Sequence, residues 1–118
     1  MSKARALGMS GEEAAVDYLQ KRKYRVIRRG FRFHRGEIDI IAYDSDTLVF
    51  VEVKTRQSAD FGPPEESVTP HKQRQIRKLA EAYLMLNNLG DIACRFDILS
   101  LLSDGGQGYR IRHILDAF

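Results

Sequence analysis

The sequence predicts an α/β fold in which one helix, three strands, a second helix and two further strands follow one another. Two helix-start signals support this order: Ser10-Gly-Glu-Glu13 has the pattern of a capping box, and Thr69-Pro70 places a cap before a proline. Between them, two β-branched runs flank a turn-rich segment at 44–47, which predicts a central hairpin. With 118 residues, the chain is expected to form one domain, 1–118.

The first helix is predicted from Ser10 to about Gln20 or Arg22. Its apolar stripe consists of Ala15, Val16 and Leu19. Glu12 falls on the same stripe, and an inward carboxylate is unfavourable unless it is paired or bound to a metal. Glu12 is therefore a candidate third acid of a site, with an interaction with the helix dipole as the alternative.

The first strand is predicted from Tyr24 to Ile27, continuing to Phe33 with an irregularity at Gly30. Phe31 and Phe33 alternate with polar residues, so one face of this strand is expected to be packed and the other solvated. Both rings are interpreted as core residues, and stacking on nucleic-acid bases is the alternative.

Basic residues are concentrated between Lys21 and Arg35, where eight Lys or Arg occur without an acid. Such a segment suits a polyanion such as DNA, and the alternative is a strand edge protected by charge. Residues 1–9 are expected to form a flexible basic arm. The candidate DNA contacts are Lys3, Arg5, Arg28, Arg29, Arg32, Arg35, Arg56, Lys72, Gln73 and Arg77.

The central hairpin carries ionisable side chains in strands that are otherwise apolar. If the turn is centred in 44–47, residues whose numbers sum to 91 face each other. Asp39 then faces Glu52, and Glu37 faces Lys54, all on one side of the sheet. The opposite side is expected to be apolar and to hold Ile38, Ile40, Ala42, Val49, Val51 and Val53.

Two opposed carboxylates, Asp39 and Glu52, should repel each other unless a positive group lies between them. A divalent metal fits this position, because hard oxygen ligands suit Mg²⁺ or Mn²⁺. Lys54 can reach the same point. The alternative is an ion-pair ladder in which Glu37 pairs with Lys54.

The segment 57–68 is expected to be irregular because of its glycine and prolines. The second helix is predicted to begin at Thr69-Pro70 and to end near Asn88. Lys72 and Gln73 extend its inward stripe upstream, so they can reach the carboxylates or a phosphate. A solvated first turn is the alternative.

Two strands are predicted near the C-terminus, from Ile92 to Leu102 and from Tyr109 to Ile114, the latter at the sheet edge. Arg95 and Asp97 share one face of the first, which favours a structural ion pair. Cys94 is interpreted as a small core residue. The histidines, which are expected at the surface, are His34, His71 and His113.

The composition is that of an ordinary globular chain, with 43% hydrophobic and 30% charged residues. No apolar run has the length of a membrane span, and residues 1–5 lack the apolar core of a signal peptide. We therefore expect a cytoplasmic protein without a membrane partner. A single cysteine excludes an internal disulfide, and the net charge of +3 is only weak support for nucleic-acid binding.

Asp39 followed by Glu52-Val-Lys54 resembles the PD-(D/E)xK nuclease signature, although Ile38 stands where a proline often precedes the aspartate. Longer phrases resemble the YraN-like family of small bacterial proteins, which is similar to archaeal Holliday-junction resolvases. These phrases are Gly11-Glu12 with Ala14-Ala15, Gly36-Glu-Ile-Asp-Ile-Ile41, Val49-Phe-Val-Glu-Val-Lys-Thr-Arg56 and Arg95-Phe-Asp97.

The resemblance implies a restriction-endonuclease-like αβββαβ core, with a mixed central sheet flanked by helices and a C-terminal edge strand. It also implies a metal-dependent DNA endonuclease acting on branched DNA, with Mg²⁺ or Mn²⁺ held by Asp39, Glu52, the Val53 carbonyl and Glu12. Lys54 would orient the attacking water. Junction resolvases act as homodimers, which makes a homodimer a candidate assembly. The alternatives are a non-catalytic DNA-binding module and an interaction scaffold.

Overall fold

A computed structural model describes residues 10–57, 64–106 and 108–118 of the chain. Its elements follow the predicted order and confirm the α/β fold. Residues 1–9, with Lys3 and Arg5, lie outside the described residues. The elements are α2 (Gly11–Lys21), β1 (Arg25–Phe33), β2 (Gly36–Asp44), β3 (Thr47–Arg56), the 3₁₀ turn η1 (Pro64–Ser67), α3 (Pro70–Leu86), β4 (Cys94–Ser103) and β5 (Tyr109–Ile114).

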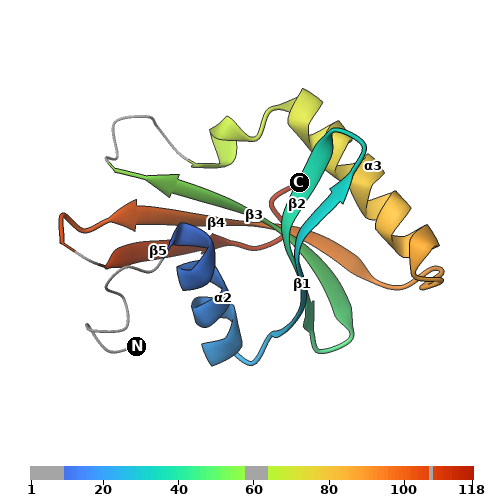
Figure 1. The fold of residues 1–118 in the computed structure, drawn as a ribbon, viewed down its shortest axis with the longest axis horizontal. Helices are drawn as coiled ribbons and strands as arrows, with labels where there is room; N and C mark the ends of the chain where they lie inside the picture. Colours follow the sequence, from blue (N-terminus) through green and yellow to red (C-terminus); the bar gives the residue numbers. More distant parts are fainter. Residues whose placement is uncertain (1–9, 58–63, 107) are drawn as a thin grey trace.

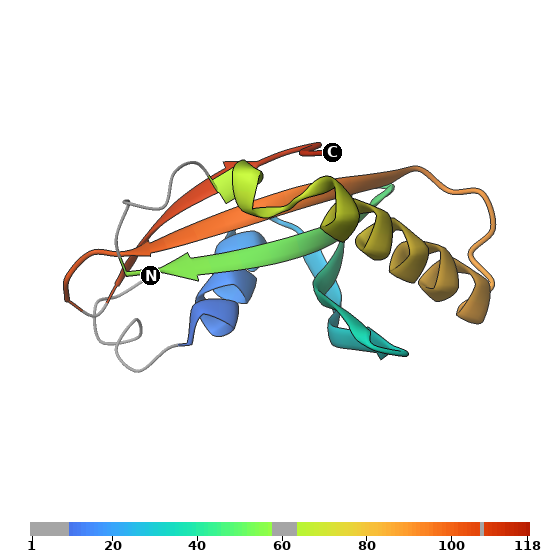
Figure 2. The ribbon, with the colours of Figure 1, turned by 90° about the horizontal axis from the view of Figure 1, so that it is seen from above.

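The strands form one mixed sheet in the order β1-β2-β3-β4-β5. Only β3 and β4 run parallel, and α3 belongs to the crossover that a parallel connection requires. Figures 1 and 2 show α2 and α3 on either side of the β1–β2 hairpin, which bends away from the long strands β3 and β4. This bend positions the site described below.

The two helices cover opposite faces of the sheet. Buried side chains of β2 and β3 alternate between them: Ile41 and Phe50 pack in the cluster with α3, whereas Ile40 and Val51 pack in the cluster with α2. The predicted apolar face is confirmed along most of its length. The prediction was wrong at Ile38, which lies in the cluster with α3.

The change of face at Ile38 coincides with a left-handed residue in the neighbouring strand β1, whereas the β1–β2 register itself shifts elsewhere, between Val26 and Arg28. Gly30 lies between the pairs Arg29–Ile40 and Phe31–Ile38 and adopts a φ of +64°. A left-handed residue interrupts the regular alternation of a strand, and glycine adopts it without steric cost. Beyond this point Phe31 and Ile38 both join the cluster with α3.

Two further expectations were wrong. Cys94 is exposed, because it is the first residue of β4 and the buried part of that strand begins at Phe96. The side chain of His113 is only 7% exposed and bonds to the fully buried Asp97. No helix in the described part of the chain is both long and apolar enough to cross a membrane.

Candidate functional site

The site lies where β2 and β3 separate. Their pairing has the predicted register, with Asp44 opposite Thr47, but the last main-chain pair is Ile40 with Val51. At the next position the side chain of Asp39, and not its main chain, bonds to β3. Its Oδ2 accepts a hydrogen bond from the Val53 N–H at 2.8 Å. From there β3 continues with β4 as its partner, so a cleft opens between the strands.

This cleft has a volume of about 310 Å³ and a largely polar lining. Glu52, which is 8% exposed, contributes to its wall from β3, and Asp39 contributes from β2. Helix α3 closes one side with Lys72. The lining residues are Arg35, Gly36, Glu37, Asp39, Glu52, Lys72, Gln75, Ile76 and Leu79.

Asp39 and Glu52 contact each other inside this cleft, and the contact affects the pKa of Glu52. Burial, together with a side-chain hydrogen bond and the negative charge of Asp39, raises the pKa of Glu52 to about 8. The charges of Lys72 and Lys54 act in the opposite direction. The charged form of Glu52 is therefore disfavoured beside Asp39, and a divalent cation bound there would favour it.

Two more carboxylates approach Asp39 from the other side. Glu12, Glu37 and Asp39 each offer an oxygen, and these oxygens lie within 4.8 Å of one another. The structure thus brings Glu12 of α2 to Asp39, as its stripe position suggested. Glu37 belongs to the same group, on the sheet face where the sequence placed it beside Asp39, although it was expected there opposite Lys54.

The expected pair of Glu37 with Lys54 was wrong. Glu37 instead accepts from Arg32, with 2.8 Å between Oε2 and Nε. Because β2 and β3 already separate at Asp39, a main-chain register cannot bring Glu37 opposite Lys54. The true partner of Glu37 could have been predicted from pairing within the β1–β2 hairpin, which places Arg32 opposite Glu37.

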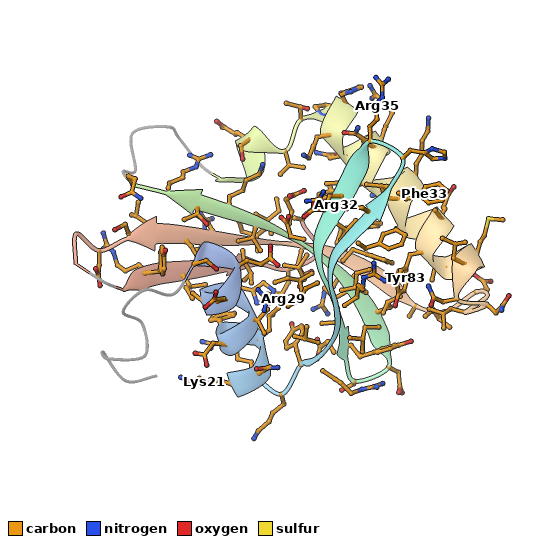
Figure 3. All side chains as sticks on the ribbon, in the orientation of Figure 1. Lys21, Arg29, Arg32, Phe33, Arg35 and Tyr83 are labelled. Carbon is orange, nitrogen blue, oxygen red and sulfur yellow. The ribbon has the colours of Figure 1, made fainter. Side chains whose placement is uncertain are left out.

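Two of the predicted DNA contacts are engaged with site carboxylates. Arg29 Nε lies 3.3 Å from Glu12 Oε1, and Arg32 pairs with Glu37. Figure 3 shows Arg29 beside α2 and Arg32 on the β1–β2 hairpin. These two ion pairs partly neutralise the outer carboxylates, whereas Asp39 and Glu52 share their cleft with Arg35 and Lys72.

The remaining predicted contacts are dispersed. Arg35 and Lys72 line the cleft. Arg28 lies over the Phe31 ring, with 5.5 Å from Cζ to the ring centroid. Arg56 ends β3 beyond the cleft.

Gln73 and Arg77 have other partners. Gln73 donates from Nε2 to the Val68 carbonyl at 3.0 Å, which fixes the approach to α3. The guanidinium of Arg77 lies over the ring of Phe96, 4.8 Å from its centroid, and 5.7 Å from that of Phe118. Neither residue lines the carboxylate cleft.

Two glycines allow the elements around the site to approach closely. A methyl group on Gly11 would overlap the Thr55 hydroxyl, so this glycine lets the first turn of α2 pack against β3. A methyl group on Gly36 would lie 2.7 Å from Leu79 Cδ1, so glycine lets the hairpin pack against α3 without displacing Leu79. Both residues directly precede a carboxylate of the site, Glu12 and Glu37.

A separate charged network lies on the α2 side of β4. Arg95 Nε donates to Asp97 Oδ1 at 2.8 Å, which confirms the predicted ion pair. His113 Nε2 lies 2.7 Å from Asp97 Oδ2, and the Asp116 amide donates to Oδ1 at 3.0 Å. Burial raises the pKa of Asp97, but the hydrogen bonds from His113 and Arg95 outweigh it and keep that pKa below its ordinary value.

The chain matches the model of the Uncharacterised protein family UPF0102 over residues 11–101. It belongs to this family. The matched range includes all four acids of the site. The YraN-like assignment made from the sequence motifs is thereby confirmed at the level of the family.

Curated UPF0102 proteins are similar along almost the whole chain. The UPF0102 protein of Geobacter sulfurreducens is 48% identical over 112 residues, covering 95% of this chain and 88% of the relative. The one from Geotalea uraniireducens is 50% identical over 114 residues, covering 97% and 90%. That of Prosthecochloris aestuarii is 47% identical over 117 residues, covering 95% and 92%.

Proposed function

We propose that this UPF0102 protein is a metal-dependent endonuclease of the PD-(D/E)xK type that hydrolyses phosphodiester bonds in DNA. The observation that carries the proposal is the contact between Asp39 and Glu52 at the point where β2 and β3 separate. Two neighbouring carboxyls in a half-enclosed polar cleft do not stabilise a fold, since like charges repel each other there. They are a suitable pair of ligands for a divalent cation.

The chemistry of the donors fits Mg²⁺ or Mn²⁺. Asp39 and Glu52 would hold the ion together with the Val53 carbonyl, and Glu12 and Glu37 supply further oxygens beside Asp39. A bound ion of this kind polarises a phosphate and lowers the pKa of a water ligand. The high pKa of Glu52 means that the metal competes with a proton for this carboxylate.

The lysines around the cleft supply the remaining functions. The charges of Lys72 and Lys54 both lower the pKa of Glu52, which supports a role for these lysines beside the proposed metal. In the proposed reaction Lys54 orients the attacking water or stabilises the developing charge. Lys72 and Arg35 border the cleft and hold the phosphate backbone.

The preference for branched DNA and the homodimer rest on the resemblance to junction resolvases. Both belong to the proposal and are tested with it. A panel of linear, flapped and four-way DNA incubated with Mg²⁺ or Mn²⁺ tests activity and preference together, and size-exclusion chromatography with light scattering gives the oligomeric state. Cleavage of the branched substrates should disappear when a chelator is added.

Asp39→Ala is the decisive variant, with Asp46→Asn as its control. Asp46 is an exposed acid in the β2–β3 turn, at the opposite end of the β2–β3 ladder from Asp39. We expect Asp39→Ala to lose cleavage while Asp46→Asn retains it. Persistent cleavage by Asp39→Ala would refute the site.

A non-catalytic DNA-binding module is the second candidate. The ion pairs Arg29–Glu12 and Arg32–Glu37 favour it, because they engage two of the four acids with cations from the same chain. Such a protein would bind branched DNA in a salt-dependent manner and leave it uncut at every metal concentration.

A further inference from the structure

A second groove adjoins the carboxylate cleft, between the β1–β2 hairpin and α3. It has a volume of about 540 Å³ and is mainly apolar. The two cavities share Arg35, Gly36, Gln75 and Leu79, so they are continuous. The groove is lined by Phe33, His34, Arg35, Gly36, Gln75, Lys78 and Leu79.

Phe33 gives this groove an exposed aromatic surface. It is 36% exposed, whereas Phe31, two residues earlier on the same strand, is 5% exposed. The two rings are nearly parallel, with an interplanar angle of 6° and 6.5 Å between centroids. The edge of His34 supports Phe33 from another side at 4.3 Å. The expectation that Phe33 is a core residue was therefore wrong, because its ring lies at the surface between Phe31 and His34, where Figure 3 labels it.

Cations flank this ring. Arg35 comes from the hairpin turn and Lys78 from α3, and both are exposed. In the described part of the chain, neither has a carboxylate partner within salt-bridge distance. Arg35 also borders the carboxylate cleft, so it lies between the two cavities.

An aromatic surface that is bordered by cations and adjoins the carboxylate cleft, where we propose phosphodiester cleavage, has the chemistry of a nucleotide site. A flat ring stacks on any base, and guanidinium and ammonium groups bind the phosphates on either side. A base inside a duplex is already stacked on its neighbours and cannot lie on Phe33. The occupant must be a nucleotide that is unpaired or displaced.

We propose that this groove binds an unpaired nucleobase of the DNA strand whose phosphate lies in the carboxylate cleft. The base stacks on Phe33, and Arg35 and Lys78 hold the adjoining phosphates. This inference rests on the proposed nuclease function and identifies its substrate class as DNA with an unpaired nucleotide next to the cut. Fully paired duplex leaves the groove without a ligand.

The test measures binding without cleavage, in a buffer containing a chelator. Two DNA probes of equal length and charge are compared, a fully paired duplex and one with a single-stranded flap that carries 2-aminopurine next to the junction. The wild-type chain should bind the flap more tightly and quench the 2-aminopurine, because stacking on an aromatic ring contributes about 1–3 kcal/mol per base. Phe33→Leu should lose roughly 10-fold in flap affinity and all quenching, with duplex affinity unchanged.

Matched variants separate stacking from folding. Phe33→Trp should keep both the affinity and the quenching. Phe118→Leu, which removes an aromatic ring that stacks on Phe96, should leave both unchanged. Arg35→Ala and Lys78→Ala should weaken binding and reduce its salt dependence by about one counterion each.

Equal affinity of Phe33→Leu and wild type for the flap, or equal losses on flap and duplex, would overturn the inference. The outcome is independent of catalysis. Phe33-dependent binding without any metal-dependent cleavage would refute the nuclease and leave the base site standing. Cleavage by Phe33→Leu with unchanged kcat/KM on the flap would refute the base site alone.

Discussion

The carboxylate of Asp39 accepts a hydrogen bond from the Val53 amide 2.8 Å away, at the place where the main chains of β2 and β3 cease to pair. The same carboxyl contacts Glu52 and lies within 4.8 Å of oxygens from Glu12 and Glu37. The Asp39 side chain thus continues the contact between β2 and β3 beyond their last main-chain pair. It also forms the centre of the acidic site. Its structural role and its chemical role can be separated by substitution.

Asp39→Asn should retain most of the stability that Asp39→Ala loses. Asparagine keeps a side-chain oxygen that can accept from the Val53 amide, whereas alanine leaves this donor unpaired at a cost of about 1–3 kcal/mol. Urea titration should therefore place Asp39→Asn above Asp39→Ala in free energy of unfolding. Both should lack metal-dependent activity. Equal stability of the two variants would show that the hydrogen bond contributes little.

The stability of the metal-free protein should decline as the pH rises through the titration range of Glu52. Its pKa is raised from an ordinary 4.5 to about 8, so the folded state binds this proton more tightly than the unfolded state does. The contribution is complete below about pH 4.5 and is lost as the pH approaches 8. Above that value no further loss from this group is expected.

Glu52→Gln provides the measurement. It keeps the shape and removes the titration, so at pH 8.5 without metal it should melt higher than wild type by ~5 °C, while at pH 4.5 the two should coincide. Mn²⁺ should raise the melting temperature of wild type and not that of the variant. Identical pH profiles would contradict the raised pKa.

Arg29 should compete with a divalent cation for Glu12, because its Nε lies 3.3 Å from the Glu12 carboxylate. The side chains of Arg29 and Glu12 are 46% and 35% exposed, so the pair is weak, about 0.2–1 kcal/mol. Arg29→Ala should then bind Mn²⁺ up to ~5-fold more tightly in calorimetry and bind DNA more weakly. Arg25→Ala is the control, since Arg25 lies over the Tyr43 ring and touches no site acid.

Local signals in the sequence were sufficient for the elements and for the hairpin register. Ser10 does accept from the Glu13 amide, and Thr69 from that of Lys72, as capping signals predict. The partner of Glu37 and the face of Ile38 could not be predicted, because both depend on where a regular ladder stops. The β2–β3 ladder stops at Asp39, whose side chain bonds to Val53, and the left-handed Gly30 lies next to it in β1.

The burial of His113 and the exposure of Phe33 were harder to predict from the sequence. His113 is buried because β5 places it opposite Leu99, on the face that α2 covers, and this requires the β4–β5 register. Phe33 is 36% exposed, although Phe31 on the same strand is buried and Gly36 beyond it lies against Leu79 of α3. Alternation along a strand predicts which face of the sheet a side chain lies on, but it does not predict whether a helix covers that face at that point.

Gly36→Ala should destabilise the protein by about 1–2 kcal/mol and disturb the cleft. The added methyl would lie 2.7 Å from Leu79 Cδ1, so the hairpin must move away from α3 or Leu79 must change rotamer. The combination with Leu79→Ala should cost less than the sum of the two single changes. Gly106→Ala, in the exposed β4–β5 connection, should change the stability by a few tenths of a kcal/mol.

Asp97→Asn should be the most destabilising of these substitutions. Asp97 is fully buried and accepts hydrogen bonds from Arg95 and from the Asp116 amide, and its second oxygen contacts His113. The variant would leave Arg95 with only the partly exposed Asp44 as a charged partner, and breaking a buried pair costs about 3–5 kcal/mol. Urea titration at pH 7 measures this loss, with Asp46→Asn as the control at the surface.

The same residue should shape the acid unfolding of the protein. The pKa of Asp97 lies below its ordinary 3.8, so the folded state holds this proton less tightly than the unfolded state. Its contribution is present above about pH 3.8 and is lost as the pH falls through the lower, folded-state value. Wild type should therefore lose stability steeply below pH 4, and Asp97→Asn should show a shallower acid limb starting from a lower plateau. Parallel acid limbs would show that other carboxyls, and not Asp97, dominate this transition.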